Sequence, residues 1–470
     1  MQVSSKNIKS FTIWLKFKEC SMKETAFEKV AKFVQETSYE DLPPKLIDII
    51  KMAFTDYVGV SVAGARHKNV MAMIKYAKLN SKKREASVFC HGFKSSVQLA
   101  AMINAVSSHS LDFDDVSLST IGHPSVVIAP VCFTLSENLN LGGKDMILAY
   151  ALASEVMHKL ALCAMPEVSQ NGWHTTSVFG VFGAVVAAAV LKRSSKSEII
   201  SALGIAASKA SGVRANFGTS VKAYHAGMAC FNGIDSLLLA GCGLSSSPYS
   251  FEGVDGFMQT FGGIYEGEVD LKFGDTWDLL QNGLIFKRYP SCSGAHPAID
   301  LALEMGPKYG LNFRDIKRID VGCSLLAPKE LNYEFPTDAL QAKFSMRYAI
   351  ASALFYGGAG LGEYTNEKVA DPQIQEFMRK IYVSVDDEFK KLGFIGTSPV
   401  KIKITLENGE ILNGKCLLAK GNPQNPLSTD EMASKFYECT KDLGENKRLF
   451  ERLNELEKCE NSEEILNLIS

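Results

Sequence analysis

The sequence predicts a mainly α-helical protein in which a large helical domain, built from both ends of the chain, is interrupted by a smaller α+β domain. Three observations lead to this prediction. Apolar residues recur at helical spacing through most of residues 23–244, the longer strand-like runs come after residue 315, and a charged amphipathic helical pattern follows residue 427. We therefore expect a flexible extension at residues 1–21, helical segments at 22–284 and 422–470, and the α+β domain at 285–421.

The composition is that of an ordinary globular protein. Apolar residues make up 46% and charged residues 22% of the 470 residues, which allows a sizeable core. A net charge of −2 and the lack of an arginine-rich stripe argue against nucleic-acid binding. The longest apolar runs do not have the pattern of a membrane span. The run 177–191 is too short, and the run 147–165 is interrupted by Glu155, His158 and Lys159. We expect buried helices there, and neither a nucleic-acid nor a membrane partner.

The eleven cysteines form neither a CxxC pair nor a cluster with histidines, which argues against structural zinc and iron–sulfur sites. Their odd number in a long chain favours reduced thiols and a cytoplasmic protein. Residues 1–21 carry four lysines before the first acidic residue, but no arginine and no apolar signal core. A disordered extension is therefore expected, with an organelle address as the alternative.

Breaks in the apolar pattern separate the expected elements. Pro43-Pro44 divides the helical run 23–58, the stretch 59–64 ends it, and Gly142-Gly143-Lys144 makes a turn between two long helices. The later expected helices cover residues 70–79, 97–106, 126–138, 145–163, 177–191, 198–210, 228–244 and 298–305. Strands are expected at 316–321, 400–406 and 411–418, the last two joined by a hairpin turn at 407–410. The glycines of 253–263 follow no strand and lack a GxGxxG pattern, so no nucleotide cofactor is indicated.

The polar segment 109–125 lies between two apolar runs, and the rest of the chain is organised around it. Asp112, Asp114 and Asp115 are interpreted equally well as helix caps and turn residues or as functional carboxylates. His123 favours function, because an imidazole exchanges protons near neutral pH and nearby carboxylates orient it. His109 is more simply explained as a helix histidine with satisfied hydrogen bonds.

Three further segments carry candidate residues. His174 precedes an expected helix that is rich in small residues. The N-terminus of this helix can be interpreted as an ordinary cap, and it would also favour a bound carboxylate. The segment 211–227 places Arg214, Lys222 and His225 between apolar helices, where an unpaired charge costs free energy. We therefore favour a site for an acidic ligand over a solvated loop with ordinary surface cations. The segment 286–300 contains a basic turn with Lys287 and a histidine, His296, near a helix start.

Six motifs resemble the MmgE/PrpD family, which includes 2-methylcitrate dehydratases, cis-aconitate decarboxylases and iminodisuccinate epimerases. They are HSLDFDD with GHPS, GWHTTS with GVFGA, GIAASKASGVRANFGTSVKAYHAG, KRYPSCSGAHPAID, AKFSMRYAIASAL and KGNPQNPLSTDEM, in the family's order. The resemblance implies a helical domain made from both chain ends, an inserted α+β lid, a homodimer, and chemistry without cofactor or metal. It also implies that Asp112, His123, His174, Lys222 and His296 line a pocket between helical domain and lid.

The sequence departs from the decarboxylases of the family at two places. They carry a threonine directly after the DFDD box, where this chain has Val116 and one extra residue before His123. Their lid tyrosine has no clear counterpart, since Tyr333 is only nearby and Tyr348 belongs to another motif. These two departures argue against decarboxylation.

The expected function is that of a lyase that removes water from a citrate-like di- or tricarboxylic acid, as a 2-methylcitrate dehydratase does. Lys222 and Arg214 would hold substrate carboxylates, with His225 and Lys287 also in the binding set. His123 and His174 would exchange protons, Asp112 would orient one imidazole, and closure of the lid would bring His296 in. The alternatives are an epimerase, a cis-aconitate decarboxylase, and a catalytically silent acid-binding or scaffold dimer.

Overall fold

The computed structural model describes residues 24–469 except 265–268, 270 and 394–396. The expected flexible extension at 1–21 lies outside the described residues. The described part is mainly helical, which confirms the predicted class. None of its helices combines the length and the apolar character needed to cross a membrane.

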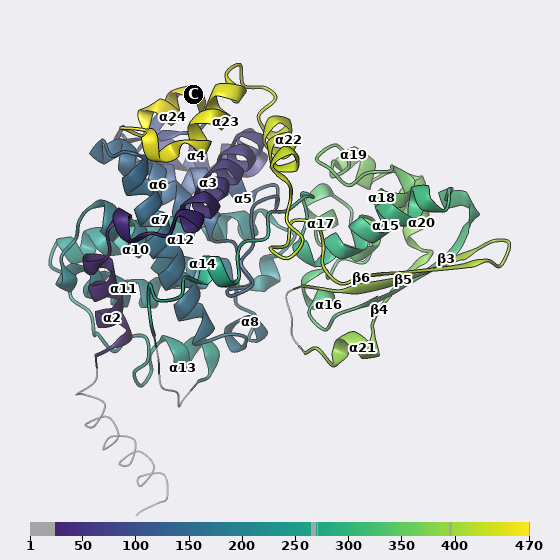
Figure 1. Cartoon of the computed structure of the whole chain (residues 1–470), viewed down its shortest axis with the longest axis horizontal. Coiled ribbons are helices and arrows are strands. Elements are labelled where there is room, and N and C mark those ends of the chain that lie inside the picture. Colours follow the sequence, from purple (N-terminus) through teal and green to yellow (C-terminus); the bar gives the residue numbers. More distant parts are fainter. Residues whose placement is uncertain (1–23, 265–268, 270, 394–396, 470) are drawn as a thin grey trace, which may run out of the picture.

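The first region, here called the helical region, comprises residues 24–286 and 427–469. Figure 1 shows its C-terminal helices, in yellow, beside α3 from the N-terminal part of the chain, and α22 and α23 contact α3. A two-stranded antiparallel hairpin, β1 (Ala86–Val88) and β2 (Phe93–Ser95), lies at its edge. Its helices are α2 (Ala26–Glu36), α3 (Pro44–Gly64), α4 (Lys68–Asn80), α5 (Val97–His109), α6 (Ser125–Leu139), α7 (Gly143–Leu162), α8 (Glu167–Gln170), α9 (Thr175–Val178), α10 (Gly180–Leu191), α11 (Lys196–Lys209), α12 (Ser220–Gly241), α13 (Phe257–Gly262), α14 (Asp278–Gln281), α22 (Thr429–Cys439), α23 (Asn446–Asn454) and α24 (Glu463–Ile469).

The second region, here called the α+β region, comprises residues 287–421 and contains a four-stranded sheet in the order β4-β3-β5-β6. The strands β3 and β4 are parallel, and the other two pairs are antiparallel. The strands are β3 (Ile316–Cys323), β4 (Ile381–Val385), β5 (Val400–Leu406) and β6 (Ile411–Cys416); the helices are α15 (His296–Lys308), α16 (Ala327–Glu330), α17 (Ala339–Ala342), α18 (Met346–Phe355), α19 (Asn366–Val369), α20 (Pro372–Met378) and α21 (Asp387–Lys390). The strand β4 was not predicted from the sequence.

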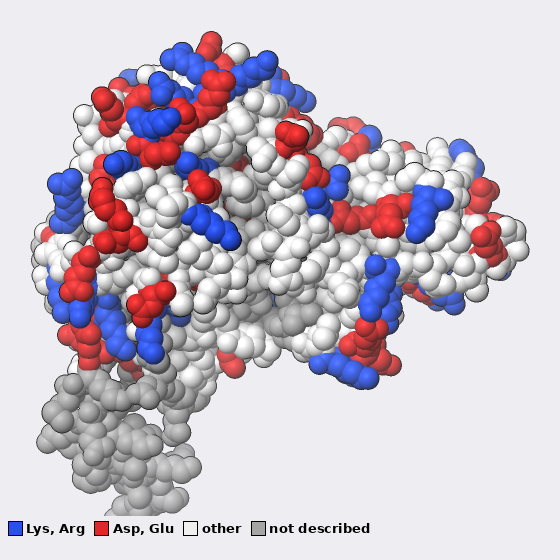
Figure 2. Space-filling view, in the orientation of Figure 1, with Lys and Arg blue, Asp and Glu red and all other residues white. Residues whose placement is uncertain are grey.

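Each region has its own hydrophobic core. One cluster of buried side chains runs from Ala26 to Phe286 and continues through Met432 to Ile469, so that both ends of the chain share one core. A second cluster extends from Tyr289 to Leu412 under the sheet. The division of the chain into domains at 284/285 and 421/422 stays a prediction. On the face seen in Figure 2, acidic and basic side chains are interspersed over both regions.

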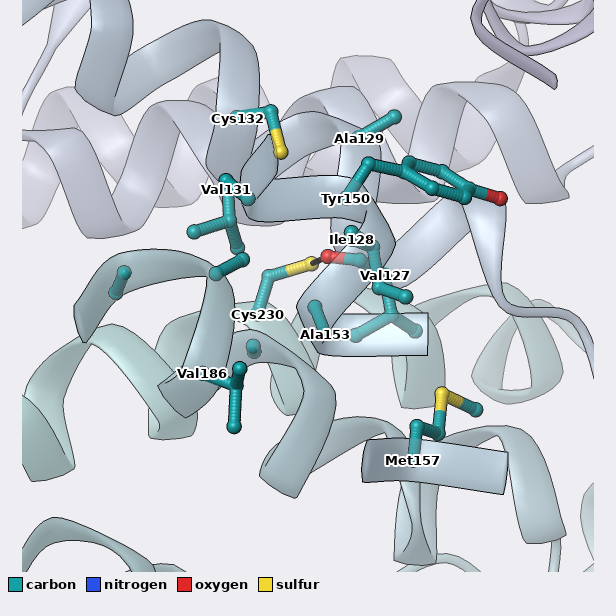
Figure 3. Close-up of a cluster of buried hydrophobic side chains, with 14 of the residues drawn as sticks. Val127, Ile128, Ala129, Val131, Cys132, Tyr150, Ala153, Met157, Val186 and Cys230 are labelled. Atoms are coloured by element: carbon teal, nitrogen blue, oxygen red, sulfur yellow. Dashed lines mark hydrogen bonds between the residues drawn. The ribbon is translucent and has the colours of Figure 1, made fainter. Parts of the chain in front are cut away.

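A proline inside α6 is accommodated by a cysteine from a neighbouring helix. Pro130 has no N–H, so it leaves the carbonyl of Val126 without its helical donor. The thiol of Cys230, on α12, donates to the carbonyls of Val126 and Val127 at 3.8 and 3.2 Å. Figure 3 shows this thiol beside Val127 and Ile128, among buried aliphatic side chains. The contact fixes α6 against α12, and both helices begin at the candidate site.

Glycines let α12 run close to its neighbours. A Cβ at Gly227 would lie 2.7 Å from the carbonyl oxygen of Met102 on α5, and one at Gly233 would lie 2.4 Å from Ala184 on α10. Because these backbones approach so closely, the first turn of α12 has a fixed position relative to the end of α5.

Two predicted boundaries were wrong. The helix α3 does not end at Gly59 but continues to Gly64, and a Cβ at Gly59 would lie 3.2 Å from the ring of Phe436. This glycine therefore serves helix packing against α22 rather than termination. The helix α12 begins at Ser220 instead of Met228, so that Lys222 and His225 lie on its first turns and not in a loop. Thr219 caps it by accepting a hydrogen bond from the N–H of Val221.

Candidate active site

A small, partly open cavity of about 40 Å³ lies where the two regions meet, which is room for a few water molecules. The helical region contributes the segment between α5 and α6, the start of α9 and the start of α12. The α+β region contributes the turn before α15, the end of α16 and Phe344. The lining residues are Asp112, Val116, Leu118, Ile121, His123, Ser169, Trp173, His174, Thr175, Arg214, Phe217, Lys222, Lys287, Cys292, Ser293, Glu330 and Phe344.

Asp112 binds two lysine ammonium groups from different parts of the chain. Its Oδ1 lies 2.5 Å from Lys222 Nζ and 2.9 Å from Lys287 Nζ, and its carbonyl accepts a second hydrogen bond from Lys287 at 2.9 Å. Burial alone would raise the pKa of Asp112, but the two ammonium groups outweigh it and hold the pKa well below its usual value. The three groups together carry one net positive charge.

The two lysines are held by different surroundings. Lys222 stands on the first turn of α12, with its Nζ 5.4 Å from the ring centre of Phe217 and 5.0 Å from that of Phe344. Lys287 is fully buried. Burial lowers its pKa, but the carboxylates of Asp112 and Asp114 reverse the shift, so the pKa is raised and the side chain stays charged.

Asp114 joins two imidazoles. Its Oδ2 lies 2.9 Å from Nδ1 of His109 and 2.8 Å from Nδ1 of His123, and the latter nitrogen is also 2.8 Å from the carbonyl of Asp115. Burial lowers the pKa of both histidines, although Asp114 acts in the opposite direction. A neutral His123 therefore donates from Nδ1 and leaves Nε2 as the basic nitrogen, 3.9 Å from Asp112 Oδ1.

His174 forms a second imidazole pair. It is the N-cap residue of α9, and its Nδ1 lies 3.0 Å from Nδ1 of His225. Burial and the neighbouring His225 hold the pKa of His174 well below its usual value, and burial lowers that of His225 to about 4. Both rings are therefore neutral at pH 7, and one Nδ1 donates to the other. His174 Nε2 is buried in the cavity wall and has no hydrogen-bond partner among the described residues.

A carboxyl group, a thiol and a guanidinium occupy another part of the wall. Glu330 is the last residue of α16, and its Oε2 accepts a hydrogen bond from Cys292 Sγ at 3.8 Å. Burial raises the pKa of Glu330, against the opposing effect of Arg214 and Lys222. Arg214 Nη1 is buried and, within the described part of the chain, makes no hydrogen bond.

The structure brings six of the eight predicted site residues to the cavity: Asp112, His123, His174, Lys222, Arg214 and Lys287. His225 lies behind His174. His296 is buried beside Tyr289, with its Nε2 3.2 Å from the carbonyl of Ser291, and is not part of the wall. It begins α15, and the turn before it places Cys292 and Ser293 in the cavity instead.

Sequence reasoning missed three groups. The contact that orients His123 comes from Asp114, while Asp112, expected in that role, holds the lysines. Cys292 lies within a motif that was already singled out, so its position carried a signal. Glu330 lies in a short charged segment that carried none.

One cluster has the spacing of a metal site. The ligand atoms of His109, Asp112, Asp114 and His123 lie within 4.8 Å of one another. However, two ammonium groups already neutralise Asp112, and both imidazoles bind Asp114. A divalent cation would face the positive charges of Lys222 and Lys287, so this donor set does not fit a metal ion.

Together, the fold and the cavity define a helical protein with an inserted α+β region and a small, cation-rich site that contains several imidazoles. The chain belongs to the MmgE/PrpD family. The MmgE/PrpD N-terminal domain matches residues 28–268, and the MmgE/PrpD C-terminal domain matches residues 289–458.

Curated relatives match most of the chain at low identity. A cis-aconitate decarboxylase of Mus musculus is 26% identical over 427 residues, covering 88% of this chain and 86% of that protein. The Homo sapiens cis-aconitate decarboxylase is 25% identical over 426 residues, with 88% of each chain covered. A cis-aconitate decarboxylase of Aspergillus terreus is 22% identical over 404 residues, with 80% and 81% covered. The chain is thus related to lyases.

Proposed function

We propose that this protein is a cofactor-independent lyase that removes water from a citrate-like di- or tricarboxylic acid. One observation carries the proposal: the cavity is small and cationic, and its wall contains buried polar atoms that lack partners among the described residues. These atoms are Asp112 Oδ2, His174 Nε2 and Arg214 Nη1. Buried polar groups are normally hydrogen-bonded, so we assign their missing partners to a polar ligand.

Charge selects the ligand class. Lys222 and Lys287 exceed the charge of Asp112 by one, and Arg214 adds a guanidinium that suits bidentate binding of a carboxylate. Because the cavity excludes most water, these attractions are stronger than they would be at the surface. A substrate with two or three carboxylates fits this balance, and it needs the two regions to separate for entry, since the cavity holds only a few waters.

The imidazoles supply the proton transfer. His123 is held by Asp114 and the carbonyl of Asp115 with its Nε2 free, as a general base requires. It would remove the proton from the carbon next to a substrate carboxylate. The charge that develops on that carboxylate would be stabilised by the ammonium groups of Lys222 and Lys287. His174 Nε2 is available to donate to or accept from the substrate, according to the proton position in its pair with His225.

Decarboxylation of cis-aconitate is the second candidate, because the curated relatives carry that name. Two features favour dehydration over it. Val116 lies in the cavity wall where the decarboxylases are expected to have a threonine. No tyrosine lines the cavity in the described part of the chain: Tyr333 donates to the carbonyl of Phe217 and Tyr348 to that of Glu363.

Proton NMR in D2O tests the proposal. The purified protein is offered 2-methylcitrate, citrate, cis-aconitate and iminodisuccinate separately. Loss of water with a new vinyl signal from a citrate-like acid is the expected result. Itaconate from cis-aconitate would replace the proposal with a decarboxylase, and deuterium uptake with exchange of epimers would replace it with an epimerase. No change with any acid would refute the proposed substrate class.

A further inference from the structure

We propose that Glu330 is the acid of the reaction, which delivers a proton to the hydroxyl group as it leaves. This inference rests on the proposed dehydration and adds a residue from the α+β region to it. Glu330 lines the same cavity as His123 and His174, which both come from the helical region. The acid and the bases would thus be contributed by opposite sides of the boundary between the two regions.

Two opposing influences act on the carboxyl of Glu330: burial favours its protonated form, and the thiol that donates to it favours the carboxylate. Within the described part of the chain, Glu330 accepts its side-chain hydrogen bond from the neutral thiol of Cys292, at 3.8 Å, and not from an ammonium group. The thiol itself remains protonated, because burial and the neighbouring Glu330 raise its pKa. The charged groups that act on the carboxyl are Arg214, Lys222 and Asp112. Burial outweighs the two cations, so that the pKa of Glu330 is raised and the proton is retained closer to neutral pH.

The geometry of the wall keeps the carboxyl in place. A Cβ at Gly294 would lie 3.4 Å from Glu330 Oε2, so the turn before α15 packs directly against this oxygen. Cys292 lies in the same turn and contacts the same oxygen. The other carboxyl oxygen, Oε1, accepts no hydrogen bond within the described part of the chain, which makes it available to a ligand in the cavity that Glu330 lines.

Elimination of water requires such a group, because hydroxide is a poor leaving group. His123 Nε2 takes the proton from carbon, and the electron pair of that C–H bond forms the new C=C bond. The C–O bond breaks as the proton of Glu330 passes to the departing oxygen, and water leaves. Glu330 is then a carboxylate, stabilised by the guanidinium of Arg214 and the ammonium of Lys222. Exchange with solvent returns a proton to Glu330 and removes one from His123, so the cycle balances.

Arg214 has a second part in this step. Burial lowers its pKa and Glu330 raises it, so the two side chains influence each other across the cavity. With Nη1 unpaired, the guanidinium is available to bind a substrate carboxylate before the reaction and to stabilise the Glu330 carboxylate after it.

The test compares Glu330→Gln with a matched control, Glu334→Gln, which removes an exposed carboxylate paired with Arg347 in the same region. We expect kcat for loss of water to fall by about 10²–10⁴-fold in E330Q, with little change in KM. Deuterium exchange at the acidic carbon should persist, because the base is intact. The activity of wild type should decrease as the pH rises and Glu330 ionises, and E330Q should lack this decrease. E334Q should behave as wild type.

Each outcome decides between the proposals. A wild type that eliminates water, together with an E330Q variant of equal kcat and equal pH profile, overturns the role of Glu330 and leaves the dehydratase standing. A wild type that eliminates water from no acid refutes the proposed function, and the role of Glu330 with it. If E330Q does not fold, Glu330→Asp replaces it. In E330D the shorter side chain should lower kcat at least tenfold and shift the pH at which activity decreases on the alkaline side. An unchanged kcat and an unchanged pH–rate profile would overturn the inference.

Discussion

The two lysines that share Asp112 allow a quantitative test of how the site is held together. We predict that Asp112→Asn lowers the free energy of unfolding by about 3–5 kcal/mol. Lys287 Nζ is buried 2.9 Å from Asp112 Oδ1, and two unit charges at that separation attract by about 6 kcal/mol at an effective dielectric constant of 20. The asparagine oxygen keeps part of the hydrogen bonding but none of the charge, so the ammonium stays buried without its counter-ion.

Asparagine is the right replacement because of the backbone. Asp112 has φ 53°, in the left-handed region, which asparagine adopts more readily than other residues that carry a Cβ. Alanine at this position would add backbone strain to the loss of charge. The measured difference for D112N therefore reports mainly on the ion pairs.

Chemical denaturation followed by circular dichroism measures the effect. Wild type, D112N, Lys287→Met and the double variant D112N/K287M form a double-mutant cycle. The double variant should be more stable than D112N alone, because it no longer buries an unpaired ammonium group. Asp320→Asn is the matched control: it removes a carboxylate that pairs with Arg318 at the surface, and its unfolding midpoint should equal that of wild type.

The pH dependence of this difference follows from the directions of the two pKa shifts. The pKa of Asp112 is lowered on folding, so its contribution is present above the unfolded value of about 3.9 and is lost as the pH falls through the folded pKa. The pKa of Lys287 is raised, so its contribution is present below about 10.4 and is lost as the pH rises through the folded pKa. Between these limits the stability difference between wild type and D112N should be larger below about pH 7 than above it, because Asp112 raises the pKa of the buried Lys343 ammonium, which burial lowers to about 7, and D112N removes that effect. A D112N variant with the wild-type midpoint, or a double variant less stable than D112N, would refute the reasoning.

Three further predictions concern activity. Lys222→Ala should lower kcat/KM by about 10²–10³-fold for the acid that wild type turns over, and Lys222→Arg should retain more activity. Steady-state rates measure both effects, and a K222A variant with wild-type rates would contradict the binding role. On the acid side, the rate should not decline until the pH falls below about 6.5, because burial lowers the pKa of His123 and His174 and keeps both neutral. Ionisation of Glu330 lowers the rate only as the pH rises, so an acid limb at or above pH 7 would be inconsistent with neutral bases. Dialysis against a strong chelator should leave turnover unchanged, because the carboxylates of Asp112 and Asp114 are already bound by lysines and imidazoles. Loss of activity that a divalent metal restores would contradict these roles of Asp112 and Asp114.

The helices could be predicted from sequence where an apolar stripe and a breaker coincide. The break at Pro43-Pro44 and the hairpin at 407–410 follow from backbone chemistry alone, and the structure has both. Gly59 misled the prediction, because a glycine that ends a helix and one that lets two helices approach are identical in sequence. The edge strand β4 was missed because it is short and pairs only with β3, on which its existence depends.

The site was predicted where its residues lie in conspicuous polar segments between apolar runs. Asp112, His123, His174 and Lys222 belong to such segments, and the structure brings them into one cavity. Which carboxylate serves which partner could not be predicted, because Asp112 and Asp114 are two residues apart and differ only in backbone direction. Glu330 could not be found either. Its side chain reaches the cavity only because α16 is docked against the turn before α15, which is a property of tertiary packing.

The segment between α5 and α6 shows how the site is kept rigid. Asp112 and Ile121 both have left-handed backbone conformations, with φ of 53° and 47°, and each costs on the order of 1–3 kcal/mol. The contacts that offset this strain are contacts of the site itself: the lysines hold Asp112, and the hydroxyl of Thr175 donates to the carbonyl of Ile121 at 2.7 Å. A substrate that drew Lys222 or Lys287 away from Asp112 would therefore weaken the support of this turn. On the proposed function, the substrate carboxylates would therefore bind to the remaining donors of these ammonium groups while Asp112 stays in place, and the same carboxylate would serve both the fold and the binding of the ligand.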